Sequence, residues 1–201
     1  MTVAQLDRAH DFTGQTVAVT GGAGVLGGEM ACALAWLGAN VAVLDRNLAH
    51  APALLERMGP HASRAEVIDT DVLDPASLAR ALDTILQRFG SVDALINGAG
   101  GNHPKATAGA NASFFDLPPE ALRWVFDLNL IGTILPCQVF GRAMARTGAG
   151  VILNVSSMNA FRPLTRIAAY SAAKAGVSNF TQWLAVHMAQ EYSPRIRVNA
   201  V

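Results

Sequence analysis

The chain has 201 residues, of which 51% are hydrophobic, 15% are charged and 6% are aromatic. Its 15 basic side chains balance 15 acidic ones. This composition predicts a folded domain with a sizeable core and excludes a disordered segment, and the absence of excess positive charge argues against a nucleic-acid-binding scaffold.

Membrane insertion and export are both disfavoured by the apolar pattern. No apolar run approaches the ~20 residues that span a bilayer, and the longest candidate, 33–44, is broken by Gly38 and Asn40. The first residues carry Asp7 and Asp11, where a signal peptide needs a positive end followed by an apolar stretch. We therefore expect a cytoplasmic protein without a membrane partner.

Metal binding and disulfide formation are also disfavoured. Cys32 and Cys137 fall in separate helical patterns far apart in the sequence, and the five histidines show no ligand spacing. We expect two reduced, buried thiols and no metal site.

Short β-branched runs alternate with helical patterns along the chain. In order, they predict a strand at 16–20, a helix at 24–37, a strand at 41–45, a helix at 48–58, a strand at 65–70, a helix at 75–89, a strand at 94–97, a long loop at 98–117, a helix at 118–146 kinked by Pro136, a strand at 151–156, a helix at 168–192 and a strand at 196–201.

Strands that are apolar on both faces and separated by helices favour a parallel sheet covered on both sides. We therefore expect an α/β fold, a doubly wound, Rossmann-like single domain over residues 1–201. Because the sequence stops in a strand without the helix expected after it, we also expect a C-terminal portion to be missing. The loop at 98–117 is too long for an ordinary connection, which indicates a functional role.

A glycine-rich turn, Thr20 to Gly27, follows the first strand and opens the first helix. Glycine lets the backbone turn sharply and approach a pyrophosphate, whose charge is stabilised at the helix N-terminus. A glycine cluster alone would be consistent with a structural turn. Here Asp45 ends the next strand about 20 residues later, where a carboxylate can accept hydrogen bonds from an adenosine ribose. Together these features predict a dinucleotide site.

The end of the second strand also bears on the choice of cofactor. Asp45 would repel a 2′-phosphate, which favours NAD, whereas the neighbouring Arg46 would attract one. We expect NAD, with NADP left open.

The turn spacing TGxxxxxG, together with Asn97-Gly98-Ala99-Gly100 after the fourth strand, resembles the short-chain dehydrogenase/reductase family. The resemblance covers nearly the whole chain, with Val25 in place of a usual glycine and Gly98 in place of the second asparagine of the NNAG motif. Asp71-Val72 resembles the family's adenine-contacting pair, although Asp71 alone would pass for a turn residue. The cofactor-binding residues that we expect are Gly21, Gly24, Leu26, Gly27, Asp45, Arg46, Asp71, Val72, Asn97, Gly98, Ala99, Tyr170 and Lys174.

A candidate catalytic group combines Ser157, Tyr170 and Lys174. The last two lie four residues apart on one helix face, and Ser157 precedes Tyr170 by the thirteen residues typical of the family. Alternatively, Tyr170 and Lys174 form only a surface pair and Ser157 only caps a helix or stabilises a turn. The presence of a nucleotide-binding motif disfavours this alternative. Asn129 matches the family's helix asparagine, thought to hold a water that links Lys174 to solvent; a lone helix asparagine would be structural.

The resemblance implies hydride transfer between C4 of nicotinamide and a substrate carbon that bears a hydroxyl or ketone. It implies that Tyr170 moves the oxygen-bound proton and that Ser157 hydrogen-bonds the same oxygen. It also implies that Lys174 stabilises the phenolate and holds the nicotinamide ribose, because a nearby positive charge favours an ionised phenol.

Two predicted loops leave the carboxyl ends of the fourth and fifth strands, where ligands bind in open parallel sheets. No acidic residue occurs between Gly98 and Phe115 or between Ser156 and Tyr170. The loop cations suit an anionic substrate, unless they are only solvated surface charges. The substrate-binding residues that we expect are Asn102, His103, Lys105, Asn159, Arg162 and Arg166.

Three segments, GAGGNHPKAT, WVFDLNLIGT and SSMNAFRPLTRIAAYSAAKAGVSNFTQWLAVHM, are similar to the branch of the family that interconverts D-mannonate and D-fructuronate. The resemblance implies an NAD(P)-dependent oxidoreductase acting on a sugar acid. Another polyol or gluconate dehydrogenase is one alternative, and a non-catalytic nucleotide-binding regulatory protein is another. The intact Ser, Tyr and Lys argue against the regulatory protein, and polar loops argue against a fatty-acyl or steroid substrate.

Apolar residues on the helices at 118–146 and 168–192 exceed one core-facing stripe. They include Phe126, Ile134, Phe140, Phe180 and Trp183. Such a surplus indicates an interface, so we expect a homo-oligomer, a dimer or a tetramer as in the family.

Overall fold

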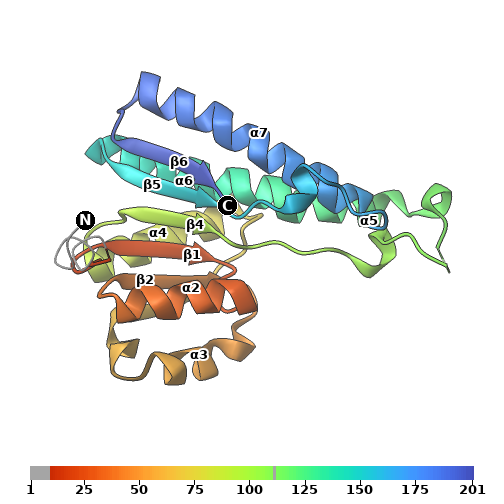
Figure 1. Cartoon of the computed structure of the whole chain (residues 1–201). Helices are drawn as coiled ribbons and strands as arrows, with labels where there is room; N and C mark the ends of the chain where they lie inside the picture. Colours follow the sequence, from red (N-terminus) through yellow and green to blue (C-terminus); the bar gives the residue numbers. More distant parts are fainter. Residues whose placement is uncertain (1–9, 111) are drawn as a thin grey trace.

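Six parallel strands form one sheet in the order β3-β2-β1-β4-β5-β6 in the computed structural model, which describes residues 10–110 and 112–201 (Figure 1). The strands are β1 Thr16–Thr20, β2 Asn40–Asp45, β3 Ala65–Asp69, β4 Ala94–Asn97, β5 Gly150–Asn154 and β6 Ile196–Ala200. The chain runs outward from β1 to β3 and then returns to β4 beside β1, so the strand order reverses between β1 and β4. This confirms the doubly wound α/β fold and creates a switch point where ligands bind.

The helices are α2 Val25–Trp36, α3 Ala51–Met58, α4 Pro75–Phe89, α5 Pro119–Phe126, α6 Gly132–Thr147 and α7 Ala168–Glu191. Side chains of β1 alternate between two cores, because Val17 and Val19 pack with α2 and α3 while Ala18 packs with α4, α6 and α7. Figure 1 shows α2 and α3 apart from α6 and α7. Residues 1–9 and Asn111 lie outside the described residues, and the boundary of the domain at 1–201 stays a prediction.

The bounds of α4 follow from local signals. Asp74 accepts a hydrogen bond from the backbone N–H of Ala76 at 2.9 Å, and Pro75 occupies the first turn. The helix ends at Gly90, which has a φ of +83° and donates to the carbonyl of Leu86. The observed helix therefore has the bounds expected from the sequence.

The long helix predicted at 118–146 is interrupted by a π-helical segment, η5 Asp127–Ile131. The side chain of Asn129 donates to the carbonyl of Val125 at 2.8 Å, which in a regular α-helix accepts from the backbone N–H of Asn129. Pro136 lies inside α6. The departure from α-helical geometry is therefore five residues or more upstream of the proline.

One helical stretch is apolar on average, although it is not an unbroken apolar run because charged residues such as Arg123 and Asp127 interrupt it. Residues Pro119–Thr147 are long and apolar enough to cross a bilayer by length and composition alone. Much of that character belongs to the core, because Val125, Phe140 and Met144 are fully buried. The core helix of a soluble protein passes the same test, and the cytoplasmic location stays a prediction.

Phe140 was expected among the surplus apolar residues of an interface, and the structure corrects this. Its side chain is fully buried among core residues, one helical turn from the buried Cys137 and Met144. The spacing of these residues makes them the stripe of α6 that faces the sheet. Cys32 and Cys137 are free and buried, as expected.

Candidate active site

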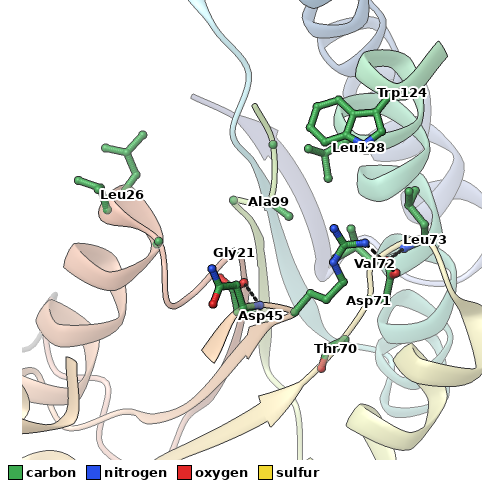
Figure 2. A pocket seen from close by; sticks show the side chains of 17 residues that line it. Gly21, Leu26, Asp45, Thr70, Asp71, Val72, Leu73, Ala99, Trp124 and Leu128 are labelled. Carbon is green, nitrogen blue, oxygen red and sulfur yellow. Dashed lines mark hydrogen bonds and ion pairs between the residues drawn. The ribbon is translucent and has the colours of Figure 1, made fainter. Parts of the chain in front are cut away.

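A cavity of about 390 Å³ lies at the carboxyl ends of β1 to β4 (Figure 2). It is lined by most of the residues that the sequence predicted to bind cofactor: Gly21, Gly24, Leu26, Gly27, Asp45, Arg46, Asp71, Val72, Gly98 and Ala99. Asn97, Tyr170 and Lys174 are not among its lining residues. The cavity is thus built by the turns that follow β1, β2, β3 and β4.

The glycine turn is shaped by close packing against the turn after β4. Gly21 has a φ of +65°, and a Cβ there would lie 2.8 Å from the backbone of Ala99. A Cβ on Gly27 would overlap the carbonyl oxygen of Gly21. At the start of α2, Gly24 supplies no side-chain cap and the first turn has no acidic residue, so the first N–H groups stay available to a phosphate. These residues fit a pyrophosphate.

Asp45 lies beside the glycine turn, and Figure 2 shows it next to Gly21. Its Oδ2 accepts the backbone N–H of Ala23 at 3.1 Å, and its Oδ1 accepts that of Asn47 at 2.9 Å. A carboxylate has about four lone-pair sites, so acceptor capacity remains for ribose hydroxyls. The neighbouring Arg46 reaches Asp71, with 3.4 Å between Nη1 and Oδ2.

Several lining residues were missed by reasoning from the sequence. Thr70 directly precedes Asp71 at the carboxyl end of β3, so its place in the sequence could have indicated that it lines the cofactor cavity. Trp124 and Leu128 enter the cavity from α5 and η5, as Figure 2 shows. Trp124 and Leu128 reach the site because α5 and η5 pack over the switch point between β1 and β4. The other lining residues that were missed are Val25, Asn47, Leu73 and Gly100.

Asn97 is placed in the core instead of the cofactor cavity. Its Nδ2 donates to Oδ1 of Asn154 at 2.9 Å and to Sγ of Cys137 at 3.2 Å. Leu95, two residues earlier, faces the same core. Because side chains alternate along a strand, Asn97 points with Leu95 toward α6. Its geometry therefore supports a structural role joining β4 to β5.

The three candidate catalytic residues lie on two elements that pack together. Ser157 caps the short helix η6 Met158–Ala160, and its Oγ accepts the backbone N–H of Asn159 at 3.2 Å. Helix α7 packs on η6 and carries Tyr170 and Lys174. The Nζ of Lys174 lies 5.7 Å from the centre of the Tyr170 ring. Ser157 also borders a cavity of about 510 Å³ between Phe161 and the end of β6.

Lys174 is almost completely buried, with 3% of the residue exposed. Burial lowers its pKa to about 8, because leaving water disfavours the ammonium form. Its Nζ donates to the carbonyl of Val155 at 2.6 Å, and no ion pair to it occurs within residues 10–110 and 112–201. Near neutral pH the site therefore holds an unneutralised positive charge beside a phenol.

Asn129 is fully buried and braces the chain after β4. Its Nδ2 donates to the carbonyl of Gly101 at 2.7 Å, and its Oδ1 accepts the Gly101 N–H at 3.1 Å. A Cβ on Gly100 would lie 3.4 Å from Nζ of Lys174. The structure thus brings Asn129, the Gly100–Gly101 segment and Lys174 together, and the water link between Asn129 and Lys174 stays a prediction.

The two loops expected to bind substrate are joined to each other. The backbone N–H of Ala108 donates to the carbonyl of Arg166 at 2.8 Å. Ala106 packs with Ala169, and Tyr170 packs against the same small cluster. The loop after β4 therefore lies against the start of α7, beside the candidate catalytic tyrosine.

Polar side chains of the first loop are held by local contacts. Asn102 donates to Oγ1 of Thr107 at 2.7 Å, while its buried Oδ1 has no partner among the described residues. Nδ1 of His103 accepts the backbone N–H of Lys105 at 3.1 Å, so the neutral ring carries its proton on Nε2. The ring of His103 meets Trp124 edge-on at 5.2 Å. These contacts place His103 next to the cofactor cavity.

The remaining substrate candidates differ in their exposure. Asn159 is buried, with 8% of the residue exposed. Lys105, Arg162 and Arg166 are exposed, and none of them forms an ion pair within the part of the chain that the structure describes. In those same residues no group of three or more His, Cys, Asp or Glu is placed to hold a metal ion.

Residues 15–201 match the model of the short chain dehydrogenase family. The chain belongs to this family. It is therefore an oxidoreductase, and the resemblance in its motifs is confirmed.

The relatives of the chain include an uncharacterized oxidoreductase and a polyol dehydrogenase. It is 43% identical over 200 residues to the uncharacterized oxidoreductase UxuB of Bacillus subtilis, covering 96% of this chain and 71% of the relative. It is 34% identical over 205 residues to the D-threitol dehydrogenase of Mycolicibacterium smegmatis, covering 100% of this chain and 75% of the relative. The chain is thus shorter than these relatives.

A similar solved structure is that of a Haemophilus influenzae protein provisionally named a D-mannonate oxidoreductase, with bound NAD. It has a TM-score of 0.88 and 40% identity, covering 97% of this chain and 72% of that one. NAD-bound xylitol dehydrogenase has a TM-score of 0.84 and 28% identity, covering 94% of this chain and 69% of that one.

Proposed function

We propose that this protein is an NAD-dependent oxidoreductase that interconverts D-mannonate and D-fructuronate. The observation that carries the proposal is that the loop cations Lys105, Arg162 and Arg166 form no ion pair among the described residues. They lie on the two joined loops that flank Ser157 and Tyr170 in the chain. A sugar acid combines a carboxylate for these cations with hydroxyls for neutral polar side chains. The Haemophilus influenzae structure with its provisional name supports the same substrate.

The residues that line the cavity would bind NAD. The turn from Gly21 to Gly27 and the N-terminus of α2 would hold the pyrophosphate, and Asp45 would accept hydrogen bonds from the adenosine ribose. Asp71 and Val72 would line the adenine end. The chemistry that NAD supplies when bound is the acceptance or donation of a hydride at the nicotinamide ring.

The catalytic side chains would act on the substrate oxygen. Tyr170 would remove the hydroxyl proton during oxidation and return it during reduction, while the hydroxyl of Ser157 hydrogen-bonds the same oxygen. Lys174 would favour the ionised phenol by its charge and hold the nicotinamide ribose. Asn129 would keep the Gly100–Gly101 segment in position beside them.

A turnover screen of the full-length protein tests this proposal. The substrates are D-mannonate and D-mannitol for oxidation and D-fructuronate for reduction, each with NAD(H) and with NADP(H). We expect D-mannonate to be oxidised and D-fructuronate reduced with NAD(H), and D-mannitol to be much poorer. Equal turnover of the acid and the polyol would refute the sugar-acid proposal.

Oxidation of a neutral polyol is the second candidate. It is favoured by the partly buried amide of Asn102, whose Oδ1 has no partner among the described residues, because such an acceptor suits a substrate hydroxyl. The relative that acts on D-threitol is in keeping with it. The same screen separates the two candidates, because a polyol enzyme would gain nothing from the carboxylate.

We also propose a homo-oligomer built on α6 and α7. Trp183, Val186 and Tyr192 are each more than half exposed. Residues 175–190 contain no Asp, Glu, Lys or Arg. A cavity of about 580 Å³ separates the two helices and is bordered by Trp183 and Phe180. An apolar, uncharged helix face of this kind supports an interface.

A further inference from the structure

Arg46 is the sole basic residue that lines the cofactor cavity in the described part of the chain. It follows Asp45, and its Nη1 lies 3.4 Å from Oδ2 of Asp71. Asp45 is the last residue of β2, and Asp71 follows the neighbouring strand β3. Figure 2 shows the two residues on either side of the cavity. The residue that follows Asp45 therefore pairs with the carboxylate that follows the adjacent strand.

Asp71 is the fixed member of this ion pair. Its Oδ1 accepts the backbone N–H of Leu73 at 2.9 Å, and its own N–H donates to Oγ of Ser77 at 3.1 Å. The side chain of Arg46 is 72% exposed, against 35% for Asp71. The carboxylate of Asp71 is thus held by its own backbone contacts, while Arg46 has room to adopt other rotamers if the ion pair breaks.

Asp45 and Arg46 have opposite effects on the choice between NAD and NADP. A guanidinium is the side chain best suited to pair with a phosphate, and NADP differs from NAD by a phosphate on the adenosine ribose. Asp45 alone therefore does not decide selectivity, because Arg46 could offset its repulsion. What decides it is whether Arg46 is available.

We propose that Asp71 is a residue that determines cofactor specificity, by keeping Arg46 from a 2′-phosphate. This inference rests on the proposed NAD-dependent function. Binding of NADP would require Arg46 to leave Asp71, and the cost of that step adds to the direct repulsion by Asp45. Because the pair is exposed, we expect the Arg46-dependent effect to be about two- to fivefold in the ratio of affinities.

A double-mutant cycle on the full-length protein tests the inference. The variants are Asp71→Asn, Arg46→Gln and the double variant, since asparagine keeps an Oδ1 that can accept from Leu73. Calorimetric titration gives the Kd of each protein for NADP and for NAD, and the ratio of the two corrects for altered adenine contacts. The same cycle is repeated in protein that carries Asp45→Asn. Removing this negative charge should strengthen NADP binding enough for its Kd to be measured.

Asp74→Asn is the matched control. It removes a carboxylate three residues from Asp71 that pairs with Arg80 at 3.8 Å and does not line the cavity. We expect Asp71→Asn to lower the ratio of the NADP Kd to the NAD Kd at least twofold, but only when Arg46 is present, and Asp74→Asn to leave it unchanged.

Three outcomes would overturn the inference. In the first, Asp71→Asn leaves the ratio of the NADP Kd to the NAD Kd unchanged. In the second, Asp71→Asn lowers this ratio equally in the presence of Arg46 and in the Arg46→Gln variant. In the third, Asp74→Asn lowers the ratio as much as Asp71→Asn does. The second of these would assign the effect to direct repulsion of the phosphate by Asp71. Failure of wild-type protein to bind NAD would instead refute the proposed function, so the two failures are distinguishable.

Discussion

The ammonium group of Lys174 donates a 2.6 Å hydrogen bond to the carbonyl of Val155, two residues before Ser157. The hydroxyl of Ser156 donates in turn to the carbonyl of Lys174 at 3.2 Å. These two bonds tie one turn of α7 to the end of β5. They therefore set the position of Tyr170 relative to Ser157. Lys174 thus supplies the positive charge beside the phenol and also helps to hold α7 against the end of β5.

Burial of Lys174 predicts a rise of stability with pH. Its pKa falls from 10.5 to about 8 in the folded protein. Between these values the unfolded chain holds a proton that the folded chain has released, so the free energy of unfolding rises as pH increases. Below pH 8 both states are protonated and the burial cost, of order 3 kcal/mol, is fully present.

Lys174→Met removes this titration. Denaturant unfolding of both proteins from pH 7 to 10 should show a difference in stability that changes with pH in favour of the wild type. A difference independent of pH would contradict the buried, depressed lysine. We also expect the variant to lack turnover.

Gly27→Ala tests the glycine turn. A Cβ there would overlap the carbonyl of Gly21, so the turn must shift. We expect the Tm to fall by about 5 °C or more and NAD binding to weaken more than tenfold. Gly28→Ala is the control in the same helix, because its Cβ would come no closer than 3.3 Å to the end of the Leu54 side chain and 3.7 Å to the carbonyl oxygen of Gly22. Equal Tm values and Kd values for the two variants would contradict the packing argument.

The substrate cations are tested by Lys105→Gln, Arg162→Gln and Arg166→Gln, singly and together. A charge-assisted hydrogen bond to a carboxylate contributes roughly 1.5–3 kcal/mol, which is about ten- to a hundredfold in kcat/KM. We expect the triple variant to lose most of the preference for D-mannonate over D-mannitol while its Kd for NAD stays similar. If all three substitutions leave kcat/KM for the acid unchanged, these cations are solvated surface charges.

Trp183→Glu tests the proposed oligomer. Trp183 is 58% exposed on α7, so a carboxylate there would place a charge in the interface. Light scattering coupled to gel filtration should show an oligomer for full-length wild type and a smaller species for the variant. Trp36→Glu is the control, because Trp36 is 53% exposed on α2, away from α6 and α7. A monomeric wild type would refute the oligomer.

The elements and the motifs that depend on local spacing could be predicted from the amino-acid sequence. The helix at 75–89, the glycine turn and the catalytic spacing from Ser157 to Lys174 are all signalled by residues close together in the chain. Helix caps, proline and glycine act over one turn, so their effect can be recognised without the rest of the fold. Asn97 could also have been assigned to the core from strand alternation with Leu95.

Contacts between side chains from segments distant in the sequence could not be predicted in this way and became visible in the folded chain. The burial of Phe140, the entry of Trp124 and Leu128 into the cavity, and the pairing of Arg46 with Asp71 each depend on how separate elements pack. An apolar helix with more than one apolar stripe does not reveal which stripe faces the sheet. Contacts of this kind are fixed by the order of the strands and the switch point between β1 and β4, which bring the ends of distant strands to one edge.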